Sequence, residues 1–250
     1  MKRVFLVALS FGALALVLAG CSLWGFSGSY RAPWRHEAEA QCLASGRLKT
    51  SAAITPLPEL DHGQLDCGAD HPFKVAAVSN GMVELSSAAL LNCPMTVAMD
   101  DWMERVVQPN AATYIGQPVV KLKLLGSYSC RHIAGVASVS EHAYMDAIDV
   151  GGFIFADGRE ILVARDWNGA DPVYRQFLRM VGGESCAVFN TVLGPDYNSD
   201  HHDHFHLDMA ARLKSHRRVC KGGQLYDGPM AYGLPTFTGS ITPGNEDDDE

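Results

Sequence analysis

Residues 147–163 read Ala-Ile-Asp-Val-Gly-Gly-Phe-Ile-Phe-Ala-Asp-Gly-Arg-Glu-Ile-Leu-Val. Two apolar, β-prone runs in this stretch flank the Asp157-Gly158 dipeptide, and Asp-Gly between such runs is a strong signal for a β-hairpin. We therefore predict a strand from Ala147 to Phe155. This strand would carry the carboxylate of Asp149.

Further strands and helices are indicated on both sides of this hairpin. Val119 to Leu125 alternates apolar residues with lysines, which predicts a half-buried strand, and Phe205 to Met209 reads as a short strand. Asp171-Pro172 fits an N-cap followed by proline at the first helical position, so we expect a helix to begin there. From Val83 to about Gln108 the apolar residues recur with a helical period, and we expect a helix that Pro94 divides or restarts.

The composition excludes several classes of protein. The chain has 250 residues, of which 47% are hydrophobic and 19% are charged, so it can bury a substantial core and is not largely disordered. Its 28 acidic side chains outnumber its 20 lysines and arginines and give a formal net charge of −8. Because phosphate binding needs a basic surface, this balance argues against nucleic acid as a partner.

The N-terminus has the pattern of an exported bacterial lipoprotein. A basic start precedes an apolar run from Val4 to Leu18, which is too short to cross a bilayer and fits a signal peptide. Ala19-Gly20-Cys21 follows and resembles a lipobox, so we expect a lipoprotein signal peptide over residues 1–20 and a lipid anchor on Cys21. Ser22 replaces the aspartate of an inner-membrane retention signal and favours the outer membrane of a Gram-negative cell envelope, facing the periplasm. The alternative is an ordinary secretory signal with a chance cysteine.

Export changes how the remaining six cysteines are interpreted. An even number in an oxidising compartment predicts up to three structural disulfides, whose pairing the sequence does not determine. These cysteines are Cys42, Cys67, Cys93, Cys130, Cys186 and Cys220.

The chain is expected to contain one main domain with a segment on each side. Residues 21–59 read as a tether and N-terminal segment with a short helix from Arg35 to Ser45, and the main domain covers residues 60–222. The tail at residues 223–250 is rich in glycine and proline and ends in five acidic residues that repel one another, so we expect it to be disordered.

Two short clusters contain most of the residues that could carry out chemistry. Residues 140–149 read Ser-Glu-His-Ala-Tyr-Met-Asp-Ala-Ile-Asp, and residues 200–208 read Asp-His-His-Asp-His-Phe-His-Leu-Asp. Four of the ten histidines lie in the second cluster, which on composition alone would also suit a solvated chelating loop. On a strand, however, His204 and His206 project from the same face while their apolar neighbours face the core.

These side chains suit a catalytic zinc site. Asp149 is expected on a strand and His142 in the loop or turn before it. One carboxylate and two imidazoles around a tetrahedral Zn²⁺ leave the fourth position for water, as in catalytic sites. Amide hydrolysis is the natural chemistry of such a site.

The order of these motifs resembles a known group of enzymes. Ser-x-His followed by Asp and, at long range, by His-x-His is similar to the LAS group of zinc peptidases, which includes D-Ala-D-Ala carboxypeptidases and murein endopeptidases. More narrowly, the chain resembles the bacterial extensin-like C-terminal domain over roughly residues 60–222. The motifs that carry this resemblance are Gly126-Ser-Tyr-Ser-Cys-Arg131, Ser140-Glu-His-Ala, Ala147-Ile-Asp149, Asp196-Tyr-Asn and His201-His-Asp-His-Phe-His206. The resemblance implies an α+β fold, with a small antiparallel sheet, helices on one side, and ligands on neighbouring strands.

The resemblance also implies the ligands of the metal. His142, Asp149 and His206 would bind Zn²⁺. The catalytic base is either His204 or Asp203, because members of the group use one or the other of these two positions. We prefer His204, since strict alternation along a strand would point Asp203 away from the site.

Other residues receive substrate-binding roles from the resemblance. Arg131 would hold the scissile carbonyl or the developing oxyanion, with a surface salt bridge as the alternative. Ser140 would either donate to a substrate carbonyl or carboxylate or cap the local turn. Met145 stands where many relatives have glycine, which predicts a less tightly turned path from His142 to Asp149.

The resemblance therefore implies a zinc-dependent hydrolase of peptidoglycan stem peptides, acting at bonds next to D-alanine. The sequence leaves open whether it is a D,D-endopeptidase or a D,D-carboxypeptidase. The alternative is a non-catalytic lipoprotein that binds the cell envelope and uses the metal only to stabilise its fold.

Overall fold

The computed structural model describes residues 31–61, 65, 67–212 and 218–223. The predicted signal peptide, Cys21 and the predicted tail beyond residue 223 lie outside the described residues. Within the described part of the chain, none of the helices has the length and apolar character needed to span a bilayer.

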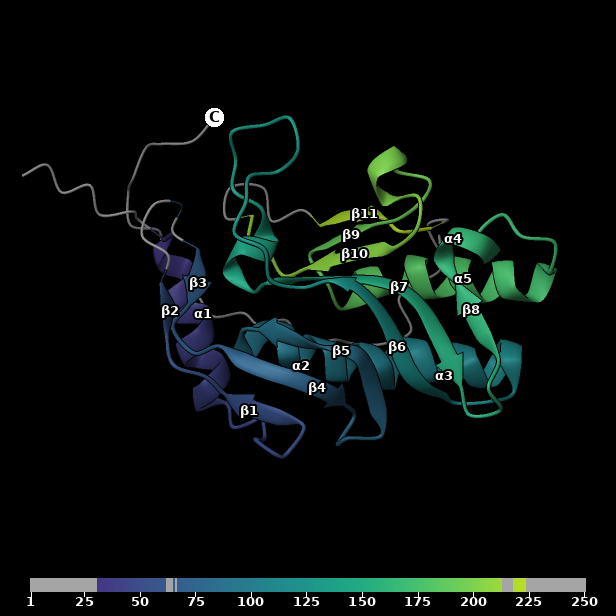
Figure 1. Ribbon diagram of the computed structural model, residues 1–250, viewed down its shortest axis with the longest axis horizontal. Helices are drawn as coiled ribbons and strands as arrows, with labels where there is room; N and C mark the ends of the chain where they lie inside the picture. The colour runs from purple at the N-terminus through teal and green to yellow at the C-terminus, as the bar shows by residue number, and fades with distance from the viewer. Residues whose placement is uncertain (1–30, 62–64, 66, 213–217, 224–250) are drawn as a thin grey trace, which may run out of the picture. The chain divides into compact units, whose positions relative to one another are not determined.

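A mixed, mostly antiparallel sheet of nine strands organises the described chain (Figure 1). Its order is β1-β4-β5-β6-β7-β10-β9-β11, and β8 also pairs with β7. The pairs β5–β6 and β9–β11 are parallel, and the others are antiparallel. The predicted antiparallel character is therefore confirmed in its main part, whereas the sheet is larger than expected. The strand bounds are β1 Ile54–Pro56, β4 Phe73–Val78, β5 Val83–Leu91, β6 Val119–Gly126, β7 Ala147–Phe155, β8 Glu160–Leu162, β9 Thr191–Leu193, β10 Phe205–Asp208 and β11 Val219–Lys221; β2 Leu60–Asp61 and β3 Gly68–Ala69 form a separate small ladder.

Several helices accompany the sheet, and Figure 1 shows α2, α3 and α5 behind it. The run from Cys93 to Ile115 is helical throughout, and π-helical stretches lie on both sides of Pro109, which has no N–H to donate. The α-helices are α1 Pro33–Ala44, α2 Cys93–Trp102, α3 Gln108–Asn110, α4 Val163–Asp166 and α5 Pro172–Glu184. The other helical segments are Met103–Val107, Ala111–Ile115, Glu141–Tyr144, Ser185–Ala187 and Ser199–His201.

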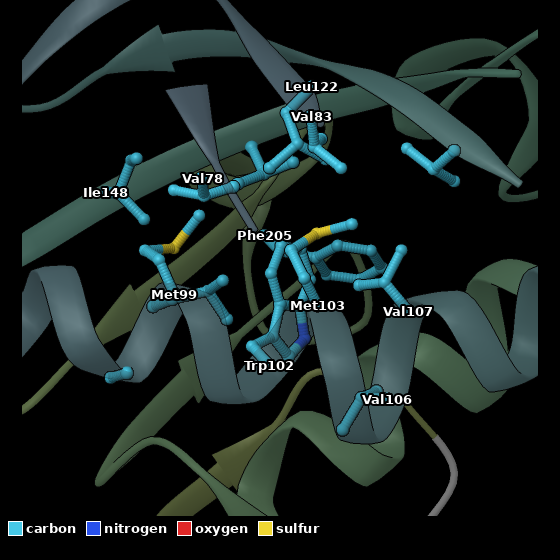
Figure 2. Close-up of a cluster of buried hydrophobic side chains, with 14 of the residues drawn as sticks. Val78, Val83, Met99, Trp102, Met103, Val106, Val107, Leu122, Ile148 and Phe205 are labelled. Carbon is cyan, nitrogen blue, oxygen red and sulfur yellow. The ribbon is translucent and has the colours of Figure 1, made fainter. Parts of the chain in front are cut away.

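The core fills the space between the sheet and these helices (Figure 2). Met99 and Met103 project from the helical run toward sheet residues such as Ile148 and Leu122. Trp102 is fully buried, and its indole N–H donates to the Ser185 hydroxyl at 2.7 Å, so its polar atom is satisfied within the core. This packing supports the strands that carry the candidate site.

The predicted hairpin at Asp157-Gly158 is confirmed. β7 and β8 pair in antiparallel register with Phe153 opposite Ile161, and Gly158 has a φ of +85° in the turn. The helix predicted to begin at Asp171-Pro172 is also confirmed, because the Asp171 carboxylate accepts the N–H of Val173 at 2.8 Å and caps α5.

The helix expected from Val83 is wrong in its first half. Val83–Leu91 is strand β5, which lies between β4 and β6 in the sheet, and the helix begins only after Asn92. The Asn92 side chain accepts the N–H of Met95 at 2.9 Å, and Pro94 occupies the first turn. Sheet pairing on both sides of β5 thus outweighs an apolar spacing that is compatible with a helix.

The folded unit includes residues assigned above to the tether. Strand β1 pairs with β4 in the main sheet, and Cys42 of α1 forms a disulfide with Cys93 of α2. These contacts join α1 and β1 to the elements of the main domain. The two other disulfides join Cys67 to Cys130 and Cys186 to Cys220, so all six cysteines that were predicted to form disulfides are paired.

Candidate metal centre

Three side chains from three elements converge at one place beside the sheet. Asp149 lies on β7 and His206 lies on β10, where the antiparallel register places the two residues directly opposite each other. His142 comes from the 3₁₀ turn Glu141–Tyr144, which precedes β7. These positions confirm the expected arrangement of two residues on neighbouring strands and one on the preceding turn.

Their inner atoms form a nearly equilateral triangle. His142 Nε2 lies 3.1 Å from His206 Nδ1 and 3.2 Å from Asp149 Oδ1, and His206 Nδ1 lies 3.1 Å from Asp149 Oδ1. Ligands 2.0–2.1 Å from a tetrahedral zinc ion stand about 3.3 Å from one another. The spacing of the three atoms therefore fits the first shell of such an ion. Among the described residues, this is the group of histidine and acidic side chains that could hold a metal.

The outer nitrogen of each imidazole already has an acceptor. The Nδ1 of His142 contacts the carbonyl oxygen of Ser127, and the Nε2 of His206 lies 3.0 Å from Asp208 Oδ2. A carbonyl oxygen accepts only, so Nδ1 of His142 donates to it and Nε2 is the nitrogen that faces the centre. The carboxylate of Asp208 favours the matching tautomer of His206. Both rings are thus oriented as metal ligands are in proteins.

The charges around the triangle favour a cation at its centre. Burial alone would raise the pKa of Asp149, but hydrogen bonds from His142 and His206 outweigh it and lower that pKa well below its ordinary value. Burial alone would lower the pKa of His206, but the carboxylates of Asp149 and Asp208 outweigh it and raise the pKa of this imidazole to about 9. Two carboxylates therefore stabilise positive charge where the two rings meet.

The turn that carries His142 is tight. Ser140 is buried, and its hydroxyl oxygen accepts the N–H of His142, so the structure places it as the cap of the turn. Met145 ends the turn with a φ of +56°, in the left-handed region, and its side chain is fully buried. The less tightly turned path expected from the lack of glycine here is wrong. A non-glycine residue in this conformation costs about 1–3 kcal/mol and persists only where its surroundings hold it.

His204 and Asp203 lie next to the triangle as a pair. His204 Nε2 lies 3.4 Å from Asp149 Oδ1, and its Nδ1 lies 2.8 Å from Asp203 Oδ1. The His204 side chain is 14% exposed and that of Asp203 is 35% exposed, so the imidazole lies nearer the centre and the carboxylate lies behind it.

Arg131 does not join this group. It is exposed, and its Nη1 donates to the carbonyl of His132 at 3.2 Å, while none of the described interactions connects it to the triangle. Its neighbour Cys130 is fixed to Cys67 by a disulfide.

Two residues near the centre received no role in the sequence analysis. Asp208 lies two residues after His206 on the same strand, and that spacing was a usable signal for a shared face. The ring of His201 lies 5.3 Å from that of His204 and 5.8 Å from that of His206, and its Nδ1 lies 2.6 Å from Asn198 Oδ1. Burial, together with the neighbouring imidazoles, lowers the pKa of His201 to about 4. Its position depends on the loop before β10, which no periodicity in the sequence predicts.

Comparison with known proteins gives one result. A family model described as "Extensin-like protein C-terminus" matches residues 40–221. No curated protein and no solved structure matches the chain.

Proposed function

This chain belongs to the Extensin-like protein C-terminus family, and we propose that it is a zinc-dependent peptidase of the bacterial cell wall that hydrolyses amide bonds in peptidoglycan stem peptides. The observation that carries the proposal is the triangle of His142, Asp149 and His206, in which the outer nitrogens have acceptors and the inner atoms face one another. Zinc bound there would take the place of the protons through which the inner nitrogens contact Asp149.

The donor set suits zinc. Two imidazole nitrogens and one carboxylate are the protein ligands of many catalytic zinc sites, which keep a further position open. Zinc bound there would supply a Lewis acid that makes water nucleophilic at neutral pH and polarises a carbonyl group.

His204 and Asp203 would carry out the proton transfer. His204 faces the centre with Nε2, while Asp203 accepts the proton on Nδ1 and so keeps Nε2 available as a base. The carboxylate also stabilises the imidazolium that forms when His204 takes up a proton. The two candidates for the base therefore receive different roles in our proposal: His204 transfers the proton, and Asp203 orients it.

Substrate binding and location complete the proposal. Arg131 is exposed, which would allow its guanidinium to pair with a carboxylate or carbonyl of a polymeric substrate. A lipid anchor on Cys21 would hold the domain at a membrane that faces peptidoglycan. Cleavage of terminal D-alanine and cleavage of cross-links are both compatible with this arrangement.

The experiment is to incubate the zinc-loaded protein with purified muropeptides and to follow the products by mass spectrometry. We expect loss of D-alanine or cleavage of cross-linked dimers by the wild-type protein. His206→Ala is expected to lose both zinc and activity, and His204→Ala is expected to retain zinc but lose turnover. His202→Ala is the matched control, because this imidazole belongs to the same histidine-rich segment but is 71% exposed.

The outcomes separate the alternatives. Muropeptides that stay intact with zinc-loaded wild-type protein, while a control peptidase cleaves them, would overturn the enzymatic proposal. Binding to insoluble peptidoglycan in the same samples would then favour the envelope-binding lipoprotein with a structural metal. Equal turnover by His204→Ala and wild type would transfer the base role to Asp203.

A further inference from the structure

An arginine from the N-terminal helix reaches the turn that carries His142. Arg35 lies in the first turn of α1 and precedes residues 40–221, which the family model matches. Its side chain is 10% exposed, so it is part of the packed structure even though it lies far from the turn in sequence.

The guanidinium contacts three residues of the turn at once. Its Nη1 and Nη2 donate to the two carboxylate oxygens of Glu141 at 2.7 and 2.8 Å, a bidentate pair. Nη1 also lies 3.5 Å from Asp146 Oδ2, and the guanidinium carbon lies 3.7 Å from the centroid of the Tyr144 ring. Trp34 lies on the guanidinium as well, at 4.2 Å. Arg35 thus holds both ends of the segment from Glu141 to Asp146.

The turn depends on such contacts because its backbone is strained at Met145. The strained residue lies between Tyr144 and Asp146, two of the residues that Arg35 contacts. Asn92 holds Asp146 from the other side, with its side-chain amide 2.9 Å from Asp146 Oδ1. Without Arg35, the carboxyl groups of Glu141 and the buried Asp146 would lose the guanidinium that lies between them.

Helix α1 provides a fixed base for this contact. The Cys42–Cys93 disulfide joins its last turn to α2. The buried Glu39 carboxylate accepts the N–H of His71 at 2.8 Å. Arg35 therefore projects from a helix that is anchored independently of the turn.

We propose that Arg35 is a positioning residue of the metal centre, which holds the turn from Glu141 to Asp146 so that His142 Nε2 meets Asp149 and His206. The inference rests on the metal-binding part of the proposed function and is independent of peptidase activity. Arg35 acts through His142 and does not touch the ligand atoms.

The test measures zinc affinity by competition with a chromogenic chelator, on full-length protein with its disulfides intact. Arg35→Gln is expected to weaken zinc binding by about tenfold or more, the range found for residues that orient metal ligands. Arg35→Lys keeps the charge but loses the bidentate geometry, and we expect it to recover only part of the affinity. Arg31→Gln is the matched control, because Arg31 is also buried, lies two residues before α1, and pairs with Asp70 at 2.8 Å away from the turn.

The zinc affinities of the variants either support or refute the positioning role of Arg35. Weaker zinc binding by Arg35→Gln but not by Arg31→Gln supports the inference, and circular dichroism must show that both are folded. Equal zinc affinity of Arg35→Gln and wild type would overturn it, as would an equal loss in Arg31→Gln. If Arg35→Gln does not fold, Glu141→Gln takes its place, with an expected loss of several-fold and the same refuting result. A wild-type protein that does not bind zinc would instead refute the proposed function itself.

Discussion

Replacing Asp208 by asparagine perturbs the metal centre without replacing a proposed ligand. Asp208 is buried, and its carboxylate accepts from two donors: Oδ2 faces His206 Nε2 at 3.0 Å, and Oδ1 accepts the N–H of Ala210 at 3.0 Å. An amide of the same shape has only one acceptor oxygen. If that oxygen faces Ala210, the amide NH₂ faces His206 and forces the imidazole proton onto Nδ1, the atom that faces the centre. If it faces His206, the NH₂ opposes the N–H of Ala210.

The magnitude follows from this mismatch. Loss of an outer partner of a metal-binding histidine weakens metal affinity by about 10–100-fold, or about 1.4–2.8 kcal/mol. Asp208→Asn is therefore expected to fall in this range. Asp208→Ala is expected to fall at its upper end, because both donors then lose their acceptor.

Chelator competition for zinc is the assay, and Asp166→Asn is the control. Asp166 is a similarly buried carboxylate that accepts the N–H of Leu162 at 2.8 Å away from the metal centre, so its replacement should lower stability without changing zinc affinity. Wild-type zinc affinity in Asp208→Asn would show that this carboxylate does not orient His206 for a metal. An equal loss in Asp166→Asn would show that general destabilisation explains the effect.

Three further predictions follow from the structure. The carboxylates around His206 raise its pKa to about 9, so zinc must displace a proton from this imidazole at neutral pH, and the affinity for zinc should fall as the pH is lowered. Calorimetry in buffers of different ionisation enthalpy should detect the released proton, and its absence would contradict the assigned pKa. Replacing both Cys42 and Cys93 by serine removes the disulfide that closes a loop with a sequence separation of 51, and should lower the free energy of unfolding by about 4 kcal/mol. Urea denaturation measures this loss, and a value below about 1 kcal/mol would refute the prediction. His204→Ala should keep zinc affinity within a few-fold of wild type, and a loss as large as that of His206→Ala would make His204 a ligand.

Much of the fold could be predicted where local chemistry and tertiary packing agree. The Asp157-Gly158 hairpin and the Asp171 cap were predicted because turn and capping residues act on their immediate neighbours. Val83–Leu91 was mistaken for a helix because its spacing of apolar residues is compatible with both elements, and pairing with two neighbouring strands decides between them. Helix α1 was expected, but its attachment to the domain depends on Cys42 and Arg35, whose partners are distant in sequence.

The candidate site, too, could be predicted only in part from the sequence. His142, Asp149 and His206 were predicted as a group, and the structure brings them together because the β7–β10 register aligns two of them. Arg131 was placed by resemblance alone, and the described contacts leave it at the surface. The left-handed Met145 could not be predicted, because methionine rarely adopts this conformation and only the surrounding contacts impose it.

The most direct test of the central claim is a crystal structure of the zinc-loaded protein with anomalous data at the zinc edge. We expect one strong peak about 2.0–2.1 Å from His142 Nε2, an oxygen of Asp149 and His206 Nδ1. A zinc ion bound instead by the histidines that precede β10, or no ion at this place under saturating zinc, would contradict the account.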